Sequence, residues 1–416
     1  MRVLFLSNFY PPHHIGGYGM LCLEVVEGLE RRGHATRVLT SAYGLDAPAD
    51  DGAVRRALAL ESELDYYSPR DALEAPRRRA DNIRCLHEEI EGWKPDLIYI
   101  WGMWNLGKAL AAAAEARIPG RVAYYIANPW PIQPNHHVAY WDTPARGRAR
   151  SWLKRLVRLP IRLWLAEEWS SPQLRLEHTH TCSVGQRDQL LAAGVVLPGD
   201  RILYEGVALG PYLAQADQRA PAQPDGRLEL VYVGILSEHK GVHTAVEALA
   251  RLDPAERARV GLTILGRGHP DYTRRLHALV EAEALSEQVH FESPIPREAL
   301  PAYLGRFDVL LMPSIWAEPL ARIMQEALAS GMVFVGTHTG GTPEIVTNDE
   351  NGLLFEPEDA GGLAAHIERL LTDPAARDRM GRAGRRTAEA RFDIERMVDE
   401  IEVQLDALLQ TAESTI

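Results

Sequence analysis

The chain has 416 residues, of which 46% are hydrophobic, so it can bury the cores of two ordinary domains and is not a disordered protein. Its 45 basic and 57 acidic residues give a net charge of −12, which argues against nucleic-acid binding as the general role. The three cysteines are widely scattered, which excludes a disulfide framework or a cysteine zinc site and fits a reducing compartment. The first twelve residues, MRVLFLSNFYPP, predict a buried strand, and no apolar run approaches the roughly 20 residues of a membrane span. We therefore expect a soluble, cytoplasmic protein.

Short apolar runs alternate with helical patterns along the chain. Strands are predicted at 3–7, 36–42, 97–101, 122–127 and 178–184 in the first half, and at 228–234, 261–266, 289–293, 309–314 and 333–338 in the second. Continuous apolar strands separated by helices indicate parallel sheets covered on both faces. Two such series predict an α/β protein of two doubly wound, Rossmann-like domains that face each other across a ligand-binding cleft.

The boundary between the two series is marked by composition. Residues 206–227, GVALGPYLAQADQRAPAQPDGR, are rich in Ala, Pro, Gln and Gly and precede a fresh strand. We predict an N-terminal domain at 1–209, a linker at 210–226 and a C-terminal domain at 227–390. The remaining residues, 391–416, are expected to form a helix that returns to the N-terminal domain.

Two loops that follow predicted strands have residues suited to a ligand. Gly16 and Gly17, in NFYPPHHIGGYGM, allow a backbone to approach a ligand closely, although their spacing is not that of dinucleotide-binding loops. Lys240, in VGILSEHKG, would place a positive charge at the same edge of its own sheet. Each feature alone also fits an ordinary turn or a surface lysine, so their weight comes from occurring together at strand ends.

The segment EPLARIMQEALASG, residues 318–331, predicts a helix with two glutamates. Pro319 favours its start and Gly331 its end, so Glu318 would lie at the entrance and Glu326 two turns inside. Eight helical residues rise about 12 Å, too far for both carboxylates to hold one metal ion but suited to the ends of one extended, hydroxyl-rich ligand. The alternative is that Glu318 only favours the helix dipole and Glu326 is a solvated surface charge.

The start of this helix is a second candidate for ligand binding. The backbone N–H groups of Leu320 and Ala321 are expected to point toward the cleft, where a helix N-terminus attracts phosphate.

Residues 231–373 resemble the nucleotide-sugar half of the retaining glycosyltransferases of family four, which have the GT-B fold. The resemblance is carried by PSIWAEPLARIMQEALASG and by GTHTGGTPEIVTNDENGLLFEP; the Gly-Gly loop and RILYEGVALGPY extend it over essentially the whole chain. It implies transfer of a sugar from a nucleotide-diphospho-sugar to an acceptor sugar, lipid or small molecule, with retained configuration. It also implies front-face attack, with neither metal nor cofactor.

The resemblance also implies roles for single residues. Glu326 would bind the ribose hydroxyls of the nucleotide, and Glu318 a hydroxyl of the transferred sugar near the reacting carbon. Lys240 and the helix N-terminus would hold the diphosphate. No convincing Asp-x-Asp metal motif is present, since Asp50–Asp51 lies in a polar loop and is interpreted as surface.

Two positions depart from the family's pattern. Ile235 stands where the family has a phosphate-binding arginine, so Arg322, or with less support Arg267, is predicted to replace it. In ANPWP, Ala127 and Asn128 stand where many members have His-Asp, which makes Asn128 a candidate contact to the sugar or the acceptor. These departures keep two alternatives open: a GT-B sugar-nucleotide epimerase or hydrolase, and a catalytically silent nucleotide-sugar-binding member.

The stretch 144–169 is the most individual part of the N-terminal half. Between Arg146 and Arg162 it has seven basic and no acidic residues, interleaved with Trp, Leu and Val. Such a segment suits peripheral contact with an anionic membrane face, and Pro160 is expected to divide it into two short helices. The favoured alternative is an ordinary covering helix with its apolar side in the core.

Overall fold

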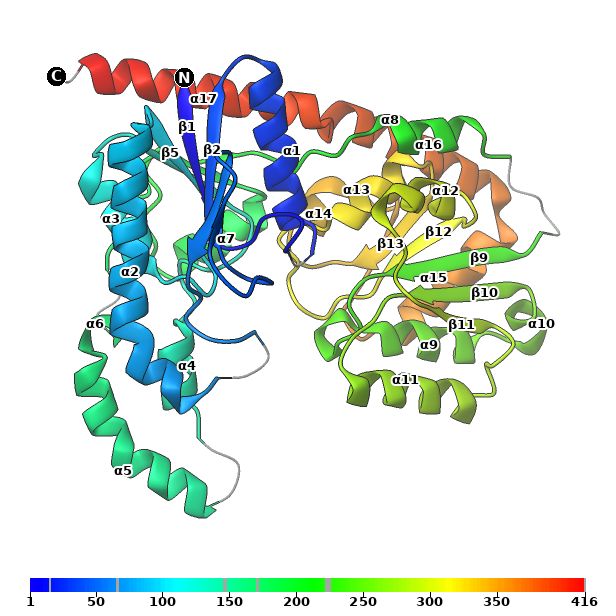
Figure 1. The fold of residues 1–416 in the computed structure, drawn as a ribbon. Helices are drawn as coiled ribbons and strands as arrows, with labels where there is room; N and C mark the ends of the chain where they lie inside the picture. The colour runs from blue at the N-terminus through cyan, green and yellow to red at the C-terminus, as the bar shows by residue number, and fades with distance from the viewer. Residues whose placement is uncertain (15, 65–66, 145–147, 170–171, 221–225, 415–416) are drawn as a thin grey trace. The chain divides into compact units, whose positions relative to one another are not determined.

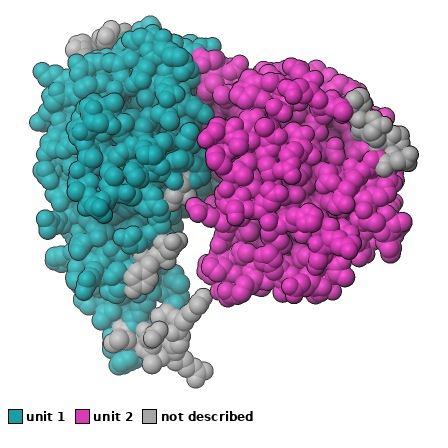
Figure 2. All heavy atoms as spheres, turned by 45° about the vertical axis from the view of Figure 1, so that its right-hand side comes forward, with its two compact units in different colours: residues 1–182, 186–203, 398–416 teal, residues 183–185, 204–397 magenta. Residues whose placement is uncertain are grey.

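The computed structural model describes the 416 residues apart from 15, 65–66, 145–147, 170–171, 221–225 and 415–416. The chain forms two compact units, coloured separately in Figure 2. Unit 1 consists of residues 1–182, 186–203 and 398–416, and unit 2 of residues 183–185 and 204–397. Each unit contains a predominantly parallel sheet with helices, which confirms the predicted α/β class.

Within the described residues, unit 1 contains an eight-stranded sheet in the order β3-β4-β2-β1-β5-β6-β7-β8 (Figure 1). The strands are β1 (Arg2–Ser7), β2 (Ala35–Ser41), β3 (Ala49–Asp50), β4 (Val54–Leu58), β5 (Leu97–Gly102), β6 (Val122–Ile126), β7 (Thr179–Thr181) and β8 (Arg201–Ile202). All neighbouring strands are parallel except β3 and β4. The five predicted strands are present, whereas β3, β4 and β8 were not predicted.

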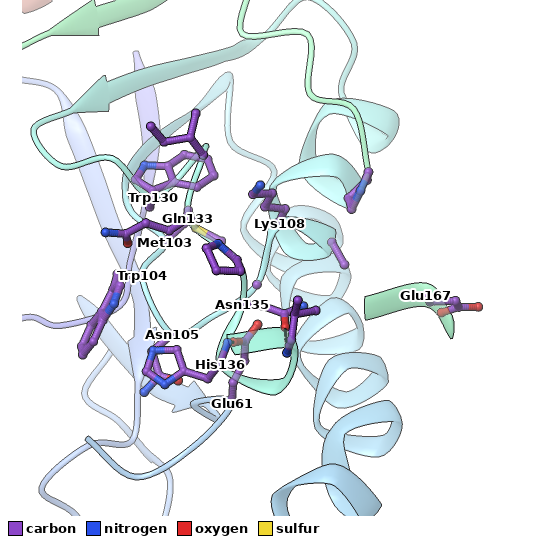
Figure 3. A pocket seen from close by; sticks show the side chains of 16 residues that line it. Glu61, Met103, Trp104, Asn105, Lys108, Trp130, Gln133, Asn135, His136 and Glu167 are labelled. Carbon is purple, nitrogen blue, oxygen red and sulfur yellow. Dashed lines mark hydrogen bonds between the residues drawn. The ribbon is translucent and has the colours of Figure 1, made fainter. Parts of the chain in front are cut away.

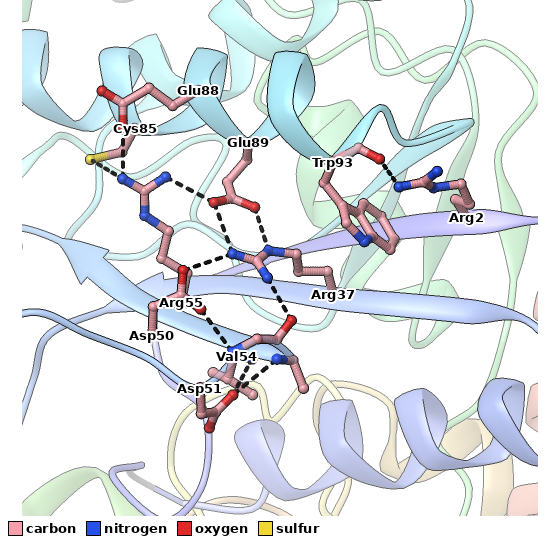
Figure 4. Close-up of polar contacts among 12 residues, drawn as sticks. Arg2, Arg37, Asp50, Asp51, Val54, Arg55, Cys85, Glu88, Glu89 and Trp93 are labelled. Atoms are coloured by element: carbon pink, nitrogen blue, oxygen red, sulfur yellow. Dashed lines mark hydrogen bonds and ion pairs between the residues drawn. The ribbon is translucent and has the colours of Figure 1, made fainter.

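The strand β4, VRRAL, was not predicted, because its two arginines lie in a strand only through hydrogen bonds to residues distant in the chain. Arg55 donates a hydrogen bond of 2.8 Å to Glu89, which also forms an ion pair with Arg37 (Figure 4). Arg56 is buried and donates a 2.9 Å hydrogen bond to the carbonyl oxygen of Tyr10. Paired in this way, two charged side chains can lie in a strand of a covered sheet.

The helices of unit 1 are α1 (Tyr18–Arg31), α2 (Pro69–Trp93), α3 (Lys108–Arg117), α4 (His136–Asp142), α5 (Arg148–Trp164), α6 (Ala166–Trp169) and most of α7 (Val184–Ala192). The long final helix, α17 (Ile394–Ser414), contributes its residues from Val398 onward to the same unit. There, Glu402 Oε1 lies 2.7 Å from His34 Nε2, and Val398 packs against Gly28 of α1.

The structure corrects the expectation for residues 144–169, of which 145–147 lie outside the described residues. Helix α5 runs through Pro160 without a break. Proline removes one backbone hydrogen bond, and Pro160 is exposed, so water can solvate the carbonyl group that loses its partner. The alternative of an apolar side in the core holds only in part: Ile161 packs against a buried cluster, whereas Trp152 and Leu156 are exposed.

Within its described residues, unit 2 contains a six-stranded parallel sheet in the order β11-β10-β9-β12-β13-β14. The strands are β9 (Leu228–Val233), β10 (Val260–Leu265), β11 (Val289–Glu292), β12 (Val309–Met312), β13 (Val333–Thr337) and β14 (Leu353–Phe355). The five predicted strands are present, and the three-residue β14 was not predicted. Helices α9 (Val242–Arg251), α11 (Pro270–Ala282), α13 (Arg322–Ala329), α15 (Ala360–Thr372) and α16 (Pro374–Arg391) are the longer helices.

The predicted linker, 210–226, is not irregular over its whole length, and its residues 221–225 lie outside the described residues. Residues Gly210–Asp217 form α8 within unit 2. Tyr212 of this helix is buried, and Arg219, just beyond it, donates a 2.7 Å hydrogen bond to the carbonyl oxygen of Phe307. Tertiary packing of one tyrosine and one arginine therefore orders a segment whose composition resembles a linker.

Candidate functional site

Lys240 and Glu318 meet at the carboxyl ends of two neighbouring strands in unit 2. Lys240 ends a short 3₁₀ helix, η1 (Glu238–Lys240), after β9, and Glu318 lies in the loop after β12. Their side chains form an ion pair, and Ser314 donates a 2.8 Å hydrogen bond to the same carboxylate oxygen of Glu318. The parallel sheet thus brings together two residues that were predicted from separate loops.

A third loop fixes the backbone of Glu318. Gly340 and Gly341 follow β13, and Gly341 donates a backbone hydrogen bond of 2.9 Å to the carbonyl oxygen of Glu318. Gly340 has φ +59, and a Cβ atom there would lie 2.0 Å from that oxygen. A side chain at Gly340 would therefore displace the loop that carries Glu318.

Helix α13 begins at Arg322, which corrects the predicted start at Pro319. The carbonyl group of Glu318 is bonded to Gly341, not to a following helical N–H group, and Ala321 is still extended, with φ −94 and ψ 115. Leu320 and Ala321 therefore precede the helix, and Glu326 lies little more than one turn inside it. The predicted end is confirmed: Gly331 has φ +70 and donates to the carbonyl oxygen of Leu328 at 3.0 Å.

Glu326 is buried among arginine side chains and is not a solvated surface residue. It is 2% exposed and accepts from Arg297 and, at 3.3 Å, from Arg322. Arg322 is itself 9% exposed, so its ion pair with Glu326 lies inside the unit. The predicted phosphate contact of Arg322 stays a prediction. Arg297 begins the 3₁₀ helix η2 (Arg297–Ala299) after β11 and was not predicted; its only sequence signal is its place after a strand.

A pocket of about 190 Å³ lies beside Arg297. It is lined by residues at or beyond the carboxyl ends of β9, β10 and β11: Val233, Gly234, Leu265, Gly266, Pro294, Ile295, Arg297 and Leu300. Apart from Arg297 its side chains are apolar or absent, so it suits a flat, weakly polar group near the buried carboxylate of Glu326.

At position 235, where the family has an arginine, this chain has the uncharged Ile235. Ile235 is largely exposed in the loop after β9, and Arg267 is also exposed. Trp316 lies near Lys240: the Nζ atom of Lys240 is 5.6 Å from the ring centroid of Trp316. The ring of His239 packs edge-on against the same indole. Burial, followed by the charge of Lys240, lowers the pKa of His239.

The remaining predicted site residues belong to unit 1. Gly16 has φ +66, which favours glycine, and Gly17 is the N-cap of α1 with an ordinary helical conformation. The side-chain oxygen of Asn128 accepts a 3.2 Å hydrogen bond from the backbone of Trp130, so it shapes the loop after β6.

Unit 1 has its own pocket, of about 260 Å³, near the carboxyl ends of β5 and β6 (Figure 3). Trp104, Trp130, Gln133 and Asn135 are among its lining residues, and Lys108 extends into it from the start of α3. The sequence did not single out these residues as a group, because they follow different strands.

Two charged side chains that line this pocket, Glu61 and Lys108, differ in their hydrogen-bond partners. Glu61 accepts a 2.9 Å hydrogen bond from the backbone of His136, whose ring packs edge-on against Trp104. Burial lowers the pKa of Lys108, and the nearby Glu61 opposes this shift. Lys108 has neither a hydrogen bond nor an ion pair from its side chain to any described residue. A half-buried ammonium group of this kind suits an anionic or hydroxyl-rich ligand.

The residues considered as metal ligands have structural partners. Asp50 pairs with Arg37 at 2.8 Å, and Asp51 accepts from the backbone of Val54, a hydrogen bond that lowers the pKa of Asp51 (Figure 4). No group of three or more His, Cys, Asp or Glu side chains in the described part of the chain is arranged to hold a metal ion.

Comparison with known proteins covers both units. Residues 214–387 match the family model "Glycosyl transferases group 1", and residues 15–192 match "Glycosyltransferase Family 4". A glycogen synthase of Mycobacterium tuberculosis is 29% identical, over 94% of this chain and 91% of its own.

Solved structures show the same architecture over the full length. Sucrose-phosphate synthase from Thermosynechococcus elongatus has a TM-score of 0.71 at 21% identity, covering 99% of both chains. HepE of Anabaena, solved with UDP-glucose, has a TM-score of 0.67 at 20% identity, covering 98% of this chain and 100% of its own. The two family models, which match both units, show that the chain belongs to the group 1 glycosyltransferases, and the solved structures show that it has the GT-B fold.

Proposed function

We propose that this protein transfers a glycosyl residue from a nucleotide-diphospho-sugar to a hydroxyl-bearing acceptor, with retention of configuration and without a metal ion or cofactor. The observation that carries the proposal is the ion pair of Lys240 and Glu318 at the strand ends of unit 2, beside the start of α13. Ala321, the N-cap of α13, has no side-chain oxygen to cap the helix, which favours an anion there.

In this proposal the donor lies along unit 2. Glu326 binds the ribose, the apolar pocket beside Arg297 receives the base, and Lys240 with the start of α13 holds the diphosphate. Lys240 stabilises the negative charge that grows on the leaving phosphate as the bond to the sugar's anomeric carbon breaks. The acceptor oxygen bonds to that carbon on the same face, and its proton passes to the departing phosphate oxygen.

Glu318 binds a hydroxyl of the sugar in the same proposal. Its carboxylate already has two partners, Lys240 and Ser314, so it is oriented before the donor binds. UDP-glucose is the first donor to test, because HepE has been solved with UDP and glucose and with UDP-glucose.

The pocket of unit 1 is proposed to receive the acceptor. Trp104 supplies an aromatic surface for a sugar ring, and Gln133 and Asn135 supply polar groups for its hydroxyls. Lys108 would pair with a carboxylate or phosphate on the acceptor, which removes the cost of burying an unpaired ammonium group.

The test is to incubate the full-length protein with a panel of nucleotide-sugars, with and without a chelator and with mixed carbohydrate and lipid acceptors. Products are identified by mass spectrometry, and their anomeric configuration by NMR. Transfer with retention, unaffected by chelator, is the expected result. Epimerised or hydrolysed donor as the sole product would favour an epimerase or hydrolase, and donor binding without any turnover would favour a silent member.

A further inference from the structure

The outward face of α5 is apolar and solvent-exposed. Trp152, Leu156, Leu159 and Leu163 recur at helical spacing, so they form one stripe along the helix. They are 64%, 55%, 66% and 71% exposed, respectively. In Figure 1, α5 lies at the end of unit 1 below α4 and α6, away from the sheet of that unit. A stripe of four large apolar side chains facing water marks an interaction surface.

The opposite face of α5 is fixed to unit 1. Lys154 lies 4.0 Å from the ring centroid of Tyr140 and donates to the carbonyl oxygen of Thr143 at 2.6 Å. Arg158 pairs with Asp142 at 2.6 Å, and Leu165, which follows the helix, is buried. The helix is therefore anchored with its apolar stripe outward, and unit 1 does not cover that stripe with any described residue.

The charge of the helix indicates what covers it. Arg155 and Arg162 are exposed on one flank of the stripe, seven positions apart, and α5 contains no acidic residue. The whole chain has a net charge of −12, so this basic surface stands against an acidic background. Another copy of so acidic a chain is the less suitable partner, whereas an anionic bilayer complements both the arginines and the apolar stripe.

We propose that α5 docks on an anionic lipid bilayer, with Trp152, Leu156, Leu159 and Leu163 in the headgroup and upper acyl region. Arg155 and Arg162 then contact lipid phosphates. Within the described residues, no helix is both long enough and apolar enough to cross the membrane, so the contact is peripheral.

The position of α5 in the chain links docking to the pocket of unit 1. His136 and Val138 in α4, before the docking helix, line that pocket, and so do Glu167 in α6 and Pro172 after it. Docking would hold both flanking segments near the bilayer, which favours an acceptor carried on a lipid. This consequence rests on the proposed function; the docking itself does not.

The experiment is co-sedimentation of the full-length protein with vesicles of phosphatidylcholine alone or mixed with equal phosphatidylglycerol. We expect the wild type to pellet with the anionic vesicles only and to be released by high salt. Arg155→Glu combined with Arg162→Glu should weaken this partition by more than about tenfold. The matched control is Arg379→Glu with Arg386→Glu on α16, where both arginines are exposed at the same spacing; it should bind like the wild type.

A second pair of variants tests the apolar stripe. Leu159→Gln with Leu163→Gln should also weaken binding about tenfold, whereas Leu191→Gln with Val196→Gln, at exposed positions elsewhere in unit 1, should not. Equal pelleting with neutral and anionic vesicles, or wild-type binding by the α5 variants, would overturn the proposal. So would a dimer that is lost in the Leu159/Leu163 variant while no vesicles are bound. Pelleting is measured without donor or acceptor. The docking proposal can therefore fail while glycosyl transfer is observed, and glycosyl transfer can be absent while docking is observed.

Discussion

Lys240 and Glu318, 78 positions apart in the chain, form an ion pair beside the ends of β9 and β12. The lysine therefore lies next to the carboxylate that we propose binds the sugar, and its Nζ atom lies 5.6 Å from the ring centroid of Trp316. A cation held in this way is oriented before a diphosphate arrives, and it need not be rearranged when negative charge develops.

Replacing Lys240 by alanine should reduce kcat about 100-fold or more, because a preorganised stabiliser of the leaving group is lost. Chelators should leave the kcat of the wild type and of the Lys240→Ala enzyme unchanged. Steady-state kinetics with the best donor measures this, and Lys94→Ala, at an exposed lysine of unit 1, is the control. A Lys240→Ala enzyme with wild-type turnover would remove the lysine from the mechanism.

Glu326→Gln should weaken binding of the free nucleoside diphosphate by about 1–3 kcal/mol, since a neutral amide accepts weaker hydrogen bonds from ribose hydroxyls. Glutamine keeps the shape of the buried side chain. Titration calorimetry gives the affinity, with Glu281→Gln on the exposed side of α11 as the control. Equal affinity of wild type and Glu326→Gln would contradict the ribose assignment.

Glu326 and Arg322 should also be coupled in stability. Glu326→Met leaves the 9% exposed Arg322 without its carboxylate and should lower the free energy of unfolding by about 3–5 kcal/mol. Adding Arg322→Met should recover part of this loss, because an apolar side chain then replaces the buried arginine, while Arg297 still lacks the carboxylate. Urea denaturation of the single and double variants gives the coupling; additive losses would show that the pair is energetically independent.

Lys108 and Trp104 should affect the acceptor and not the donor. Lys108→Ala and Trp104→Ala are expected to raise the acceptor KM about tenfold or more each while leaving nucleotide binding unchanged. The readout is transfer kinetics at saturating donor, with titration of the nucleoside diphosphate alongside. Arg121→Ala, outside the pocket lining, is the control. A loss of nucleotide affinity in either pocket variant would place these residues on the donor instead.

Unit 1 should lose stability in mild acid through His137. Burial, with smaller contributions from the charges of His136, Arg78 and Arg79, lowers the pKa of His137 from 6.5 to about 4. The unfolded chain therefore binds a proton at a pH where the folded chain does not, so stability falls as pH drops from 6.5 toward 4. Between about pH 7 and about pH 5 this group should cost about 2 kcal/mol.

Urea unfolding followed by tryptophan fluorescence measures this loss, because every tryptophan except Trp316 belongs to unit 1. His137→Gln should lose about 2 kcal/mol less than the wild type between the two pH values. His338→Gln, at an exposed histidine of unit 2, should behave like the wild type. Identical pH dependence of wild type and His137→Gln would contradict the assignment.

The sequence by itself determined the class of the fold, and it singled out Lys240 and Glu318, which the structure brings together. Continuous apolar runs such as VLFLS and VLLM are long enough to identify buried parallel strands, and their number separates two series. Lys240, Glu318 and the end of α13 at Gly331 were found because local signals mark them: a loop after a strand, a glutamate spacing and a left-handed glycine.

Only the tertiary structure decided the features that depend on distant partners. β4 is a strand because Glu89 satisfies Arg55, and α13 starts late because Gly341 takes the carbonyl group of Glu318. The buried state of Glu326 depends on Arg297, and the outward face of α5 on what anchors Lys154 and Arg158 from the other side. Hydrogen bonds and burial between residues far apart in the chain leave no periodic pattern, so neither propensity nor spacing reveals them.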